Sequence, residues 1–210
     1  MKGTIYMEQI YIIGGSPCSG KSTVAEILSD TYGLRYFKAD DRLESYISRG
    51  ASMNREICKK QAERTPEETW MREPLHQCRE ALLLYEEIID FLMDDLKRIG
   101  NDKAVITEGA AYLPYLMKRR NLPRGRYIAI TPEKEFQVSH YSQRGWIHSV
   151  LQGCSDKEQA FRNWMERDAL FAAAVNKQCE EAGYSFLVNS GKLTIEELAD
   201  VVCVHFGLKS

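Results

Sequence analysis

One stretch near the N-terminus, residues 12–28 with the sequence IIGGSPCSGKSTVAEIL, constrains the fold more than any other part of the chain. Two apolar residues run into a glycine pair, and Gly20, Lys21 and Ser22 then open an amphipathic segment. The pattern from Gly15 to Ser22 fits G-x-x-x-x-G-K-[ST], which belongs between a strand and a helix. A chain with this stretch must join a strand, a tight glycine-rich loop and a helix in one continuous unit.

Five short runs rich in β-branched and aromatic residues are predicted to be buried strands, and helical patterns lie between them. They are residues 9–14, 34–39, 103–107, 126–131 and 184–189. Strands that alternate with helices form crossover units of a parallel sheet that is covered on both faces. We therefore predict an α/β fold with three layers.

Capping signals and apolar spacing place several helices. A hydroxyl residue with a glutamate three positions later predicts a helix start at Thr65, Ser155 and Thr194. After Thr65, apolar residues three and four positions apart predict one face of a long helix packed on the sheet. They are Leu75, Cys78, Leu82, Tyr85, Ile89, Leu92 and Leu96. The same spacing marks the last helix, with Ile195, Leu198, Ala199, Val202 and Phe206.

The length of 210 residues favours a single domain spanning residues 1–210. No apolar run approaches the roughly 20 residues needed to span a bilayer, so we expect no membrane partner. The N-terminal segment lacks the apolar core and cleavage site of a secretory signal, which favours a cytoplasmic location. A net charge of -2 gives no basis for a broad nucleic-acid surface.

The six cysteines are scattered, without a C-x-x-C pair or a histidine at metal-ligand spacing. They are Cys18, Cys58, Cys78, Cys154, Cys179 and Cys203. We interpret them as reduced thiols rather than as a disulfide framework or a zinc site.

The glycine-rich loop points to a nucleoside triphosphate. Gly15 and Gly20 allow backbone angles that turn successive N–H groups inward around a phosphate, and the start of the next helix adds positive potential. Lys21 is expected to reach the β- and γ-phosphates, and the Ser22 hydroxyl to bind Mg²⁺. The predicted ATP-binding residues are Gly15, Ser16, Pro17, Cys18, Ser19, Gly20, Lys21, Ser22 and Thr23.

Carboxylates follow two of the expected strands. Asp40 and Asp41 come after the second, and Glu108 ends the third. Parallel sheets hold ligands at the carboxyl ends of their strands, so all three are expected to face the phosphate loop. We predict that Asp40 orients an attacking hydroxyl, that Asp41 contacts substrate or a Mg²⁺-bound water, and that Glu108 holds Mg²⁺ or substrate. Alternatively, Asp41 caps the following helix and Glu108 begins a turn.

The loop, followed by a strand and the sequence KADDRLE at 38–44, resembles the P-loop kinases of small molecules and nucleotides. These include shikimate, gluconate and nucleoside monophosphate kinases and chloramphenicol phosphotransferase. In the shikimate-kinase pattern D-x-D-x-x-[IL]-E the second aspartate falls on Asp40, and Leu43 and Glu44 occupy the last two positions. The first falls on Lys38, and ITEGAA at 106–111 replaces a Gly-Gly-Gly turn. Both departures argue against shikimate itself.

The resemblance implies a sheet order of 2-3-1-4-5, a substrate-binding helical insertion at about 42–80, and a lid at about 140–168. In such kinases a lid arginine contacts the phosphates, for which Arg144, Arg162 and Arg167 are the candidates. Arg162 and Arg167 are five residues apart and cannot share one line on a helix, so we expect one on ATP and the other in a salt bridge. Each arginine could instead lie on a solvated face.

The insertion offers candidates for holding an anionic or polar acceptor, foremost Arg79. The others are Arg42, Arg55, Arg72 and His76. Residues 189–193 are placed to touch the nucleotide base. Two kinds of function remain open: ATP- and Mg²⁺-dependent phosphoryl transfer to a small hydroxylated or phosphorylated metabolite, and a regulatory ATPase acting through a protein partner. The sequence leaves the acceptor, ATP against GTP and the oligomeric state undecided.

Overall fold

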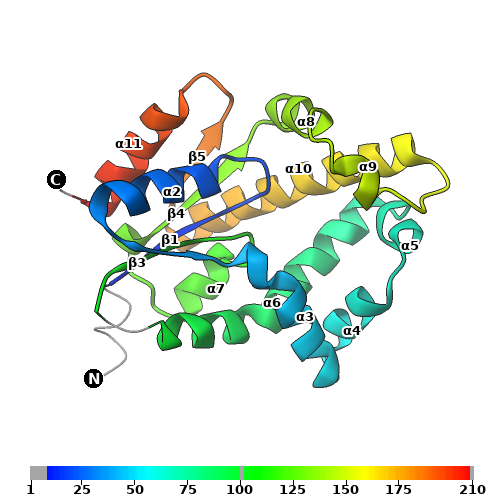
Figure 1. The fold of residues 1–210 in the computed structure, drawn as a ribbon, viewed down its shortest axis with the longest axis horizontal. Coiled ribbons are helices and arrows are strands. Elements are labelled where there is room, and N and C mark those ends of the chain that lie inside the picture. The colour runs from blue at the N-terminus through cyan, green and yellow to red at the C-terminus, as the bar shows by residue number, and fades with distance from the viewer. Residues whose placement is uncertain (1–8, 100–101, 209–210) are drawn as a thin grey trace.

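A parallel five-stranded sheet forms the centre of the protein, which a computed structural model describes over residues 9–99 and 102–208 (Figure 1). The strands are β1 (Ile10–Gly15), β2 (Arg35–Lys38), β3 (Val105–Glu108), β4 (Tyr127–Pro132) and β5 (Ser185–Asn189). Their order is β2-β3-β1-β4-β5, and every neighbouring pair is parallel. The predicted fold class and strand order are therefore confirmed. Residues 1–8, which begin the segment that we searched for a secretory signal, lie outside the described residues.

Helices cover both faces of the sheet, as Figure 1 shows. Their bounds are α2 (Lys21–Tyr32), α3 (Leu43–Ser52), α4 (Glu56–Glu63), α5 (Pro66–Trp70), α6 (Pro74–Arg98), α7 (Pro114–Arg119), α8 (Lys134–Ser142), α9 (Ile147–Val150), α10 (Lys157–Ala182) and α11 (Ile195–Phe206), with 3₁₀ turns η1 (Asp40–Arg42) and η2 (Arg124–Arg126). Helices α2 and α11 pack on one face, and α6, α7 and α10 on the other. A third apolar cluster, separate from the sheet, joins α8, α9 and the first turns of α10.

The predicted apolar faces of the long helix and of the last helix are largely confirmed. On α6, Cys78, Ile89, Leu92 and Leu96 are buried against the sheet side, whereas Leu75 is exposed. On α11, Leu198, Ala199, Val202 and Phe206 are buried, and the capping box at Thr194 is present. The capping box at Thr65 is present as well, but it starts only the short helix α5.

A break between α5 and α6 separates Thr65 from the long helix. Pro74 opens α6, and the Glu73 carboxylate accepts hydrogen bonds from the N–H groups of Leu75 (3.0 Å) and His76 (2.8 Å). Proline disfavours the helical conformation in the residue before it and has no N–H to continue the helix. The whole apolar pattern from Leu75 to Leu96 therefore lies in α6, and the cap at Thr65 starts a separate short helix.

The predicted helix start at Ser155 is wrong by one residue. Asp156 is the N-cap of α10 and accepts from the N–H of Gln159 at 2.9 Å. The Ser155 hydroxyl donates instead to Glu67 on α5, at 2.8 Å. A neighbouring carboxylate can cap the helix equally well, which frees the serine for a tertiary contact.

All six cysteines lie within the described residues and are free thiols, in agreement with the sequence. Across residues 9–99 and 102–208, no helix combines the length and the apolar character that crossing a bilayer requires.

The packing of α6 gives a stability prediction. Leu92 is 1% exposed and Leu83, on the same helix, is 46% exposed. We expect Leu92→Ala to lower the free energy of unfolding by about 2–5 kcal/mol, because it removes buried methyl groups and leaves a cavity. Leu83→Ala is the matched control and should change it by about 0.5 kcal/mol or less. Urea denaturation measures both, and equal losses would contradict the placement of α6.

Candidate active site

The loop between β1 and α2 is shaped by its glycines. Gly15 has φ +124° and Gly20 has φ +90°, angles that side chains rarely adopt. A Cβ at Gly15 would lie 1.9 Å from the carbonyl oxygen of Ile130 on β4. The N–H of Ser16 donates to that same oxygen at 3.3 Å. The loop is therefore pressed against the central strands, and residue 15 must be glycine.

The inside of this loop offers unpaired polar groups. Gly20 is the N-cap of α2 and makes no side-chain capping bond, so the first N–H groups of the helix are available to an anion. The hydroxyls of Ser16 and Ser19 are buried and have no hydrogen-bond partner. Asn189, at the end of β5, donates to the carbonyl of Ser19 at 3.0 Å and fixes the loop from the opposite side.

Lys21 lies between two carboxylates. Its Nζ is 3.6 Å from Oδ2 of Asp40 and 3.7 Å from Oε2 of Glu108. Lys21 is 5% exposed and Glu108 2%, so these two charges attract one another in a poorly solvated setting, whereas the Asp40 side chain is 41% exposed. Oδ1 of Asp40 accepts from the N–H of Ala110 at 3.1 Å, which leaves Oδ2 facing the lysine. The structure thus brings together the predicted Lys21, Asp40 and Glu108.

Gly109 and Tyr36 support this cluster, and our sequence analysis missed both. A Cβ at Gly109 would lie 2.9 Å from Oδ1 of Asp40, so only glycine lets the two strand ends meet. The Tyr36 hydroxyl donates to Oε1 of Glu108 at 3.2 Å. Nothing in the sequence marks Tyr36, because its role depends on the pairing of β2 with β3.

Burial is the main influence on Glu108 and raises the pKa of its carboxyl above the ordinary value of 4.5. The positive charge of Lys21 is the largest opposing effect, followed by hydrogen bonds from Ser22 and Tyr36, whereas Asp40 adds to the rise. The Glu108 carboxyl therefore lies beside the Ser22 hydroxyl. Its Oε2 atom has no hydrogen-bond partner.

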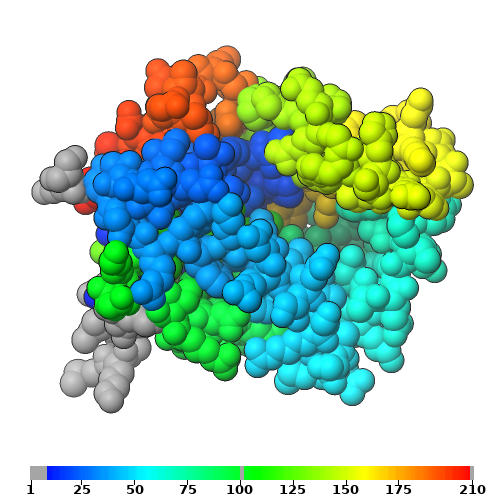
Figure 2. Space-filling view, in the orientation of Figure 1, coloured from blue at the N-terminus to red at the C-terminus, as the bar shows by residue number. Residues whose placement is uncertain are grey.

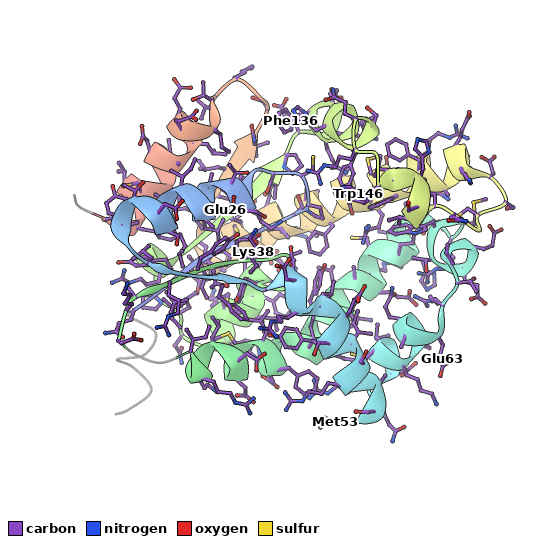
Figure 3. The ribbon with its side chains drawn as sticks, viewed as in Figure 1. Glu26, Lys38, Met53, Glu63, Phe136 and Trp146 are labelled. Carbon is purple, nitrogen blue, oxygen red and sulfur yellow. The ribbon has the colours of Figure 1, made fainter. Side chains whose placement is uncertain are left out.

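Asp41 departs from its predicted position. It follows Asp40 in the 3₁₀ turn η1, but it is exposed and does not line the cavity beside the loop. Consecutive residues of a 3₁₀ turn point about 120° apart, so only one of the two aspartates can face Lys21. Lys38, at the departure from the kinase pattern, pairs with Glu26 of α2 at 2.6 Å, and Figure 3 labels both side chains.

A cavity of about 470 Å³ opens beside the loop. Pro17 and Asp40 lie at its loop side, Leu43 and Tyr85 form part of its wall, and Trp146 and Arg167 reach it from the segment 140–168. Figure 2 shows a hollow on this face between the cyan helices and the yellow-green segment, and Figure 3 labels Trp146 there. The cavity is large enough for a small metabolite.

The three candidate arginines lie in different places. Arg167 lines the cavity and its Nε is 2.6 Å from Oδ1 of Asp168. Arg144 lies over the loop, with Nη2 3.7 Å from the sulfur of Cys18. Arg162 faces outward, 59% exposed, and pairs with Glu158 at 3.7 Å. Of the pair on α10, Arg167 therefore faces the cavity and Arg162 forms the surface salt bridge.

Of the arginines that we considered in the insertion, the foremost candidate does not line the cavity. Arg79 is exposed on α6 and lies outside the cavity lining, because the lining face of α6 passes through Gln77, Glu80 and Ala81. Arg72 does line the cavity, as does Arg64, which the sequence analysis missed.

These two arginines share one carboxylate. The Glu80 carboxylate accepts two hydrogen bonds from Arg64, at 2.7 and 2.9 Å, and a further one from Arg72. Burial alone would raise the pKa of Glu80, but the two guanidinium groups lower it to about 2. The cavity wall therefore carries a permanently ionised, net positive group.

A second cavity, of about 250 Å³, lies on the other side of the loop. Cys18 and Arg144 line it from the loop and the segment above, Phe136 from α8, and Asn189 and Leu193 from the turn before α11. Figure 3 labels Phe136 near this turn. Three of residues 189–193, which were predicted to touch a nucleotide base, therefore border a space next to the loop between β1 and α2: Asn189, Gly191 and Leu193.

Comparisons of the sequence with protein-family models and with curated proteins find no match. The function must therefore be inferred from the chemistry of this cluster and its two cavities. Carboxylates, a buried lysine and free helix N–H groups at one sheet edge suit the binding of a phosphorylated nucleotide with its cation.

The buried Glu108 gives a pH prediction. Because the folded state raises the pKa of this carboxyl, it favours the neutral form, and stability is lost as the pH rises above the ordinary value of 4.5. Glu108→Gln removes that loss, so we expect the variant to have the higher Tm near pH 8 and the difference to shrink towards pH 4. Thermal unfolding without nucleotide or Mg²⁺ measures it. The exposed Glu63→Gln is the control for loss of a carboxylate, and a lower Tm for Glu108→Gln near pH 8 would contradict the prediction.

Proposed function

We propose that the protein is a phosphotransferase that moves the γ-phosphate of ATP to a hydroxyl group of a small metabolite, with Mg²⁺ as cofactor. The observation that carries the proposal is the position of Lys21. It lies within 3.7 Å of Asp40 and Glu108, where the phosphate loop meets the larger cavity. A nucleotide in the loop and an acceptor in that cavity would meet at these three side chains.

The loop supports triphosphate binding through its backbone. The free N–H groups at the start of α2 and the buried hydroxyls of Ser16 and Ser19 would surround the phosphates, and Lys21 would exchange its carboxylate partners for phosphate oxygens. The second cavity, between Phe136 and Leu193, has room for the base. Arg144 reaches this cavity above Cys18 and would add positive charge.

Ser22 and Glu108 fit a Mg²⁺ ion. Magnesium prefers oxygen ligands and is usually held by one or two protein groups together with water and phosphate oxygens. The Oε2 atom of Glu108 has no hydrogen-bond partner and the carboxyl lies beside the Ser22 hydroxyl, which suits such a site. When bound, the ion would neutralise charge on the phosphates.

Asp40 suits the orientation of the acceptor. One of its oxygens is held by Ala110, and the other faces the junction of the loop and the cavity. Phosphoryl transfer through a loose transition state needs little basicity from such a group. Asp40 would therefore align the attacking hydroxyl rather than act as a strong base.

Arg167 is the arginine best placed for the transferred group. It lines the same cavity as Asp40 and Pro17, whereas Arg162 faces solvent. Positive charge directed at the phosphoryl group stabilises the transition state. The aromatic and apolar walls, with the Arg64, Arg72 and Glu80 group, favour a small polar acceptor over a water molecule alone, and so favour a kinase over a regulatory ATPase.

A first experiment tests acceptor-dependent transfer. Purified protein is incubated with ATP, Mg²⁺ and a panel of nucleosides, nucleotides, sugars and aminoglycoside-like acceptors, and ADP release is measured. We expect at least one acceptor to accelerate ADP release, and Lys21→Ala to abolish the effect because the phosphates lose their central cation. Wild-type release no faster than that of Lys21→Ala with every acceptor would refute transfer to these classes. Acceptor-independent hydrolysis, with a protein partner recovered only in the presence of ATP, would favour the regulatory ATPase.

A second experiment distinguishes the two arginines of α10. Removing a charge that stabilises the transferred phosphoryl group costs about 10³-fold or more in rate. We expect Arg167→Gln to lower kcat by about that factor and Arg162→Gln to leave kcat near the wild-type value. Steady-state kinetics, with thermal unfolding to verify folding, measure both. A large loss in Arg162→Gln, with Arg167→Gln unaffected, would reverse the assignment.

A further inference from the structure

Asp168 is a buried acid that the proposed chemistry does not use. It lies on α10 next to Arg167, and its side chain is 1% exposed. Burial raises the pKa of its carboxyl, and the charge of Arg167 is the largest effect that lowers it, followed by polar contacts with Trp164 and Tyr141. A carboxylate in this setting needs a charged partner, and among residues 9–99 and 102–208 Arg167 is the basic side chain in direct contact with it.

Arg167 is held from two sides. Its Nε is 2.6 Å from Asp168, and its guanidinium carbon lies 5.3 Å from the centre of the Trp70 ring. The contact with Asp168 is an ion pair at Nε and not a hydrogen bond, because the Nε atom of Arg167 has no hydrogen-bond partner. The Arg167 side chain is 19% exposed and borders the cavity. These contacts place the guanidinium between Asp168 and Trp70 at the border of the cavity.

The frame around this arginine is itself fixed. Trp70 stacks on Trp164 with ring centres 4.3 Å apart, and the side-chain amide of Asn163 donates to the Trp70 carbonyl at 3.0 Å. Helix α5 is thereby joined to α10, which lies beside it in Figure 1. Trp70 and Trp164 both line the cavity. Trp70 thus belongs to the same rigid unit as Asp168, and both restrict the same guanidinium.

Stability alone does not explain the buried pair. Replacing a buried ion pair by apolar side chains of similar size is often neutral or stabilising, because the charges must be removed from water. A charged pair at a cavity wall is therefore better explained by the direction that it imposes on Arg167.

We propose that Asp168 is a positioning residue, which holds the Arg167 guanidinium towards the phosphoryl group during transfer. The inference rests on the proposed function, because it assumes that a phosphoryl group occupies the junction of the loop and the cavity. Asp168 touches neither the nucleotide nor the acceptor and acts through Arg167.

The test compares Asp168→Asn with Glu166→Gln. Asparagine keeps the shape of the side chain and removes its charge, whereas Glu166 is a matched acid on the same helix that pairs with Lys134 at 2.5 Å. The readout needs no acceptor: the affinity for MgADP alone and for MgADP with aluminium fluoride, a mimic of the transferring phosphoryl group, is measured by calorimetry. Because its arginine is misdirected, Asp168→Asn should bind MgADP with aluminium fluoride about 10²-fold more weakly than the wild type and should bind MgADP alone with unchanged affinity. Glu166→Gln should change neither.

A double variant separates positioning from a general loss of structure. If Asp168 acts through Arg167, Asp168→Asn should have no further effect on aluminium fluoride affinity in an Arg167→Gln background. If thermal unfolding shows that Asp168→Asn does not fold, Asp168→Glu replaces it. This variant should lose part of the rise in MgADP affinity that aluminium fluoride produces, because its carboxylate is displaced by one methylene.

The outcomes separate the two proposals. A wild-type protein whose MgADP affinity does not rise with aluminium fluoride would contradict the proposed transfer function. Two results would overturn the role of Asp168 and leave the transfer function standing. The first is that aluminium fluoride raises the MgADP affinity of Asp168→Asn, or of its substitute, as much as that of the wild type. The second is that the losses of this affinity in the two single variants add up in the double variant.

Discussion

The close contact between Gly15 and the carbonyl of Ile130 sets the position of the whole site. It presses the phosphate loop onto the carboxyl ends of the central strands, where no side chain could be accommodated at residue 15. From there α2 begins with Lys21, whose amine must come to the edge of β3. The sheet register then brings the carboxylate of Glu108 to this edge, because β3 pairs with β1 through Ile13. A single backbone approach thus places a glycine-rich loop, a lysine and a carboxylate together.

The buried charges at this edge are unfavourable for stability and suit the proposed function. Glu108 and Asp168 both lie in surroundings that favour their neutral forms, and each depends on one basic side chain. Lys21 forms the ion pair with Glu108, and Arg167 forms the ion pair with Asp168. Lys21 lies beside Asp40 at the edge of the larger cavity, and Arg167 lines that cavity, so positive charge gathers where the proposed reaction would place a phosphoryl group. An apolar interior of the same shape would fold without that capability.

The segment 140–168, which was predicted to be a lid, has an apolar cluster of its own. Its apolar cluster around Trp164 is separate from the two clusters on the sheet faces, and it is joined to α5 through Trp70 and the contact of Ser155 with Glu67. The insertion and this segment therefore close the cavity from the side away from the sheet. Arg64, Arg72 and Glu80 complete the wall with a charged group that does not depend on the sheet at all.

Local patterns in the sequence determined much of the protein. The spacing from Gly15 to Ser22, the apolar strands and the capping box at Thr194 each depend on neighbours in the chain, so they predicted the loop, the five strands and the last helix. Asp40, Glu108 and Lys21 could be grouped because carboxyl ends of parallel strands share an edge.

Only the tertiary structure decided which members of each pair face the site: Asp40 rather than Asp41, and Arg167 rather than Arg162. Tyr36, Arg64 and Asp168 were likewise beyond the sequence. Side-chain direction and burial arise from contacts between residues far apart in the chain, and no local pattern contains them.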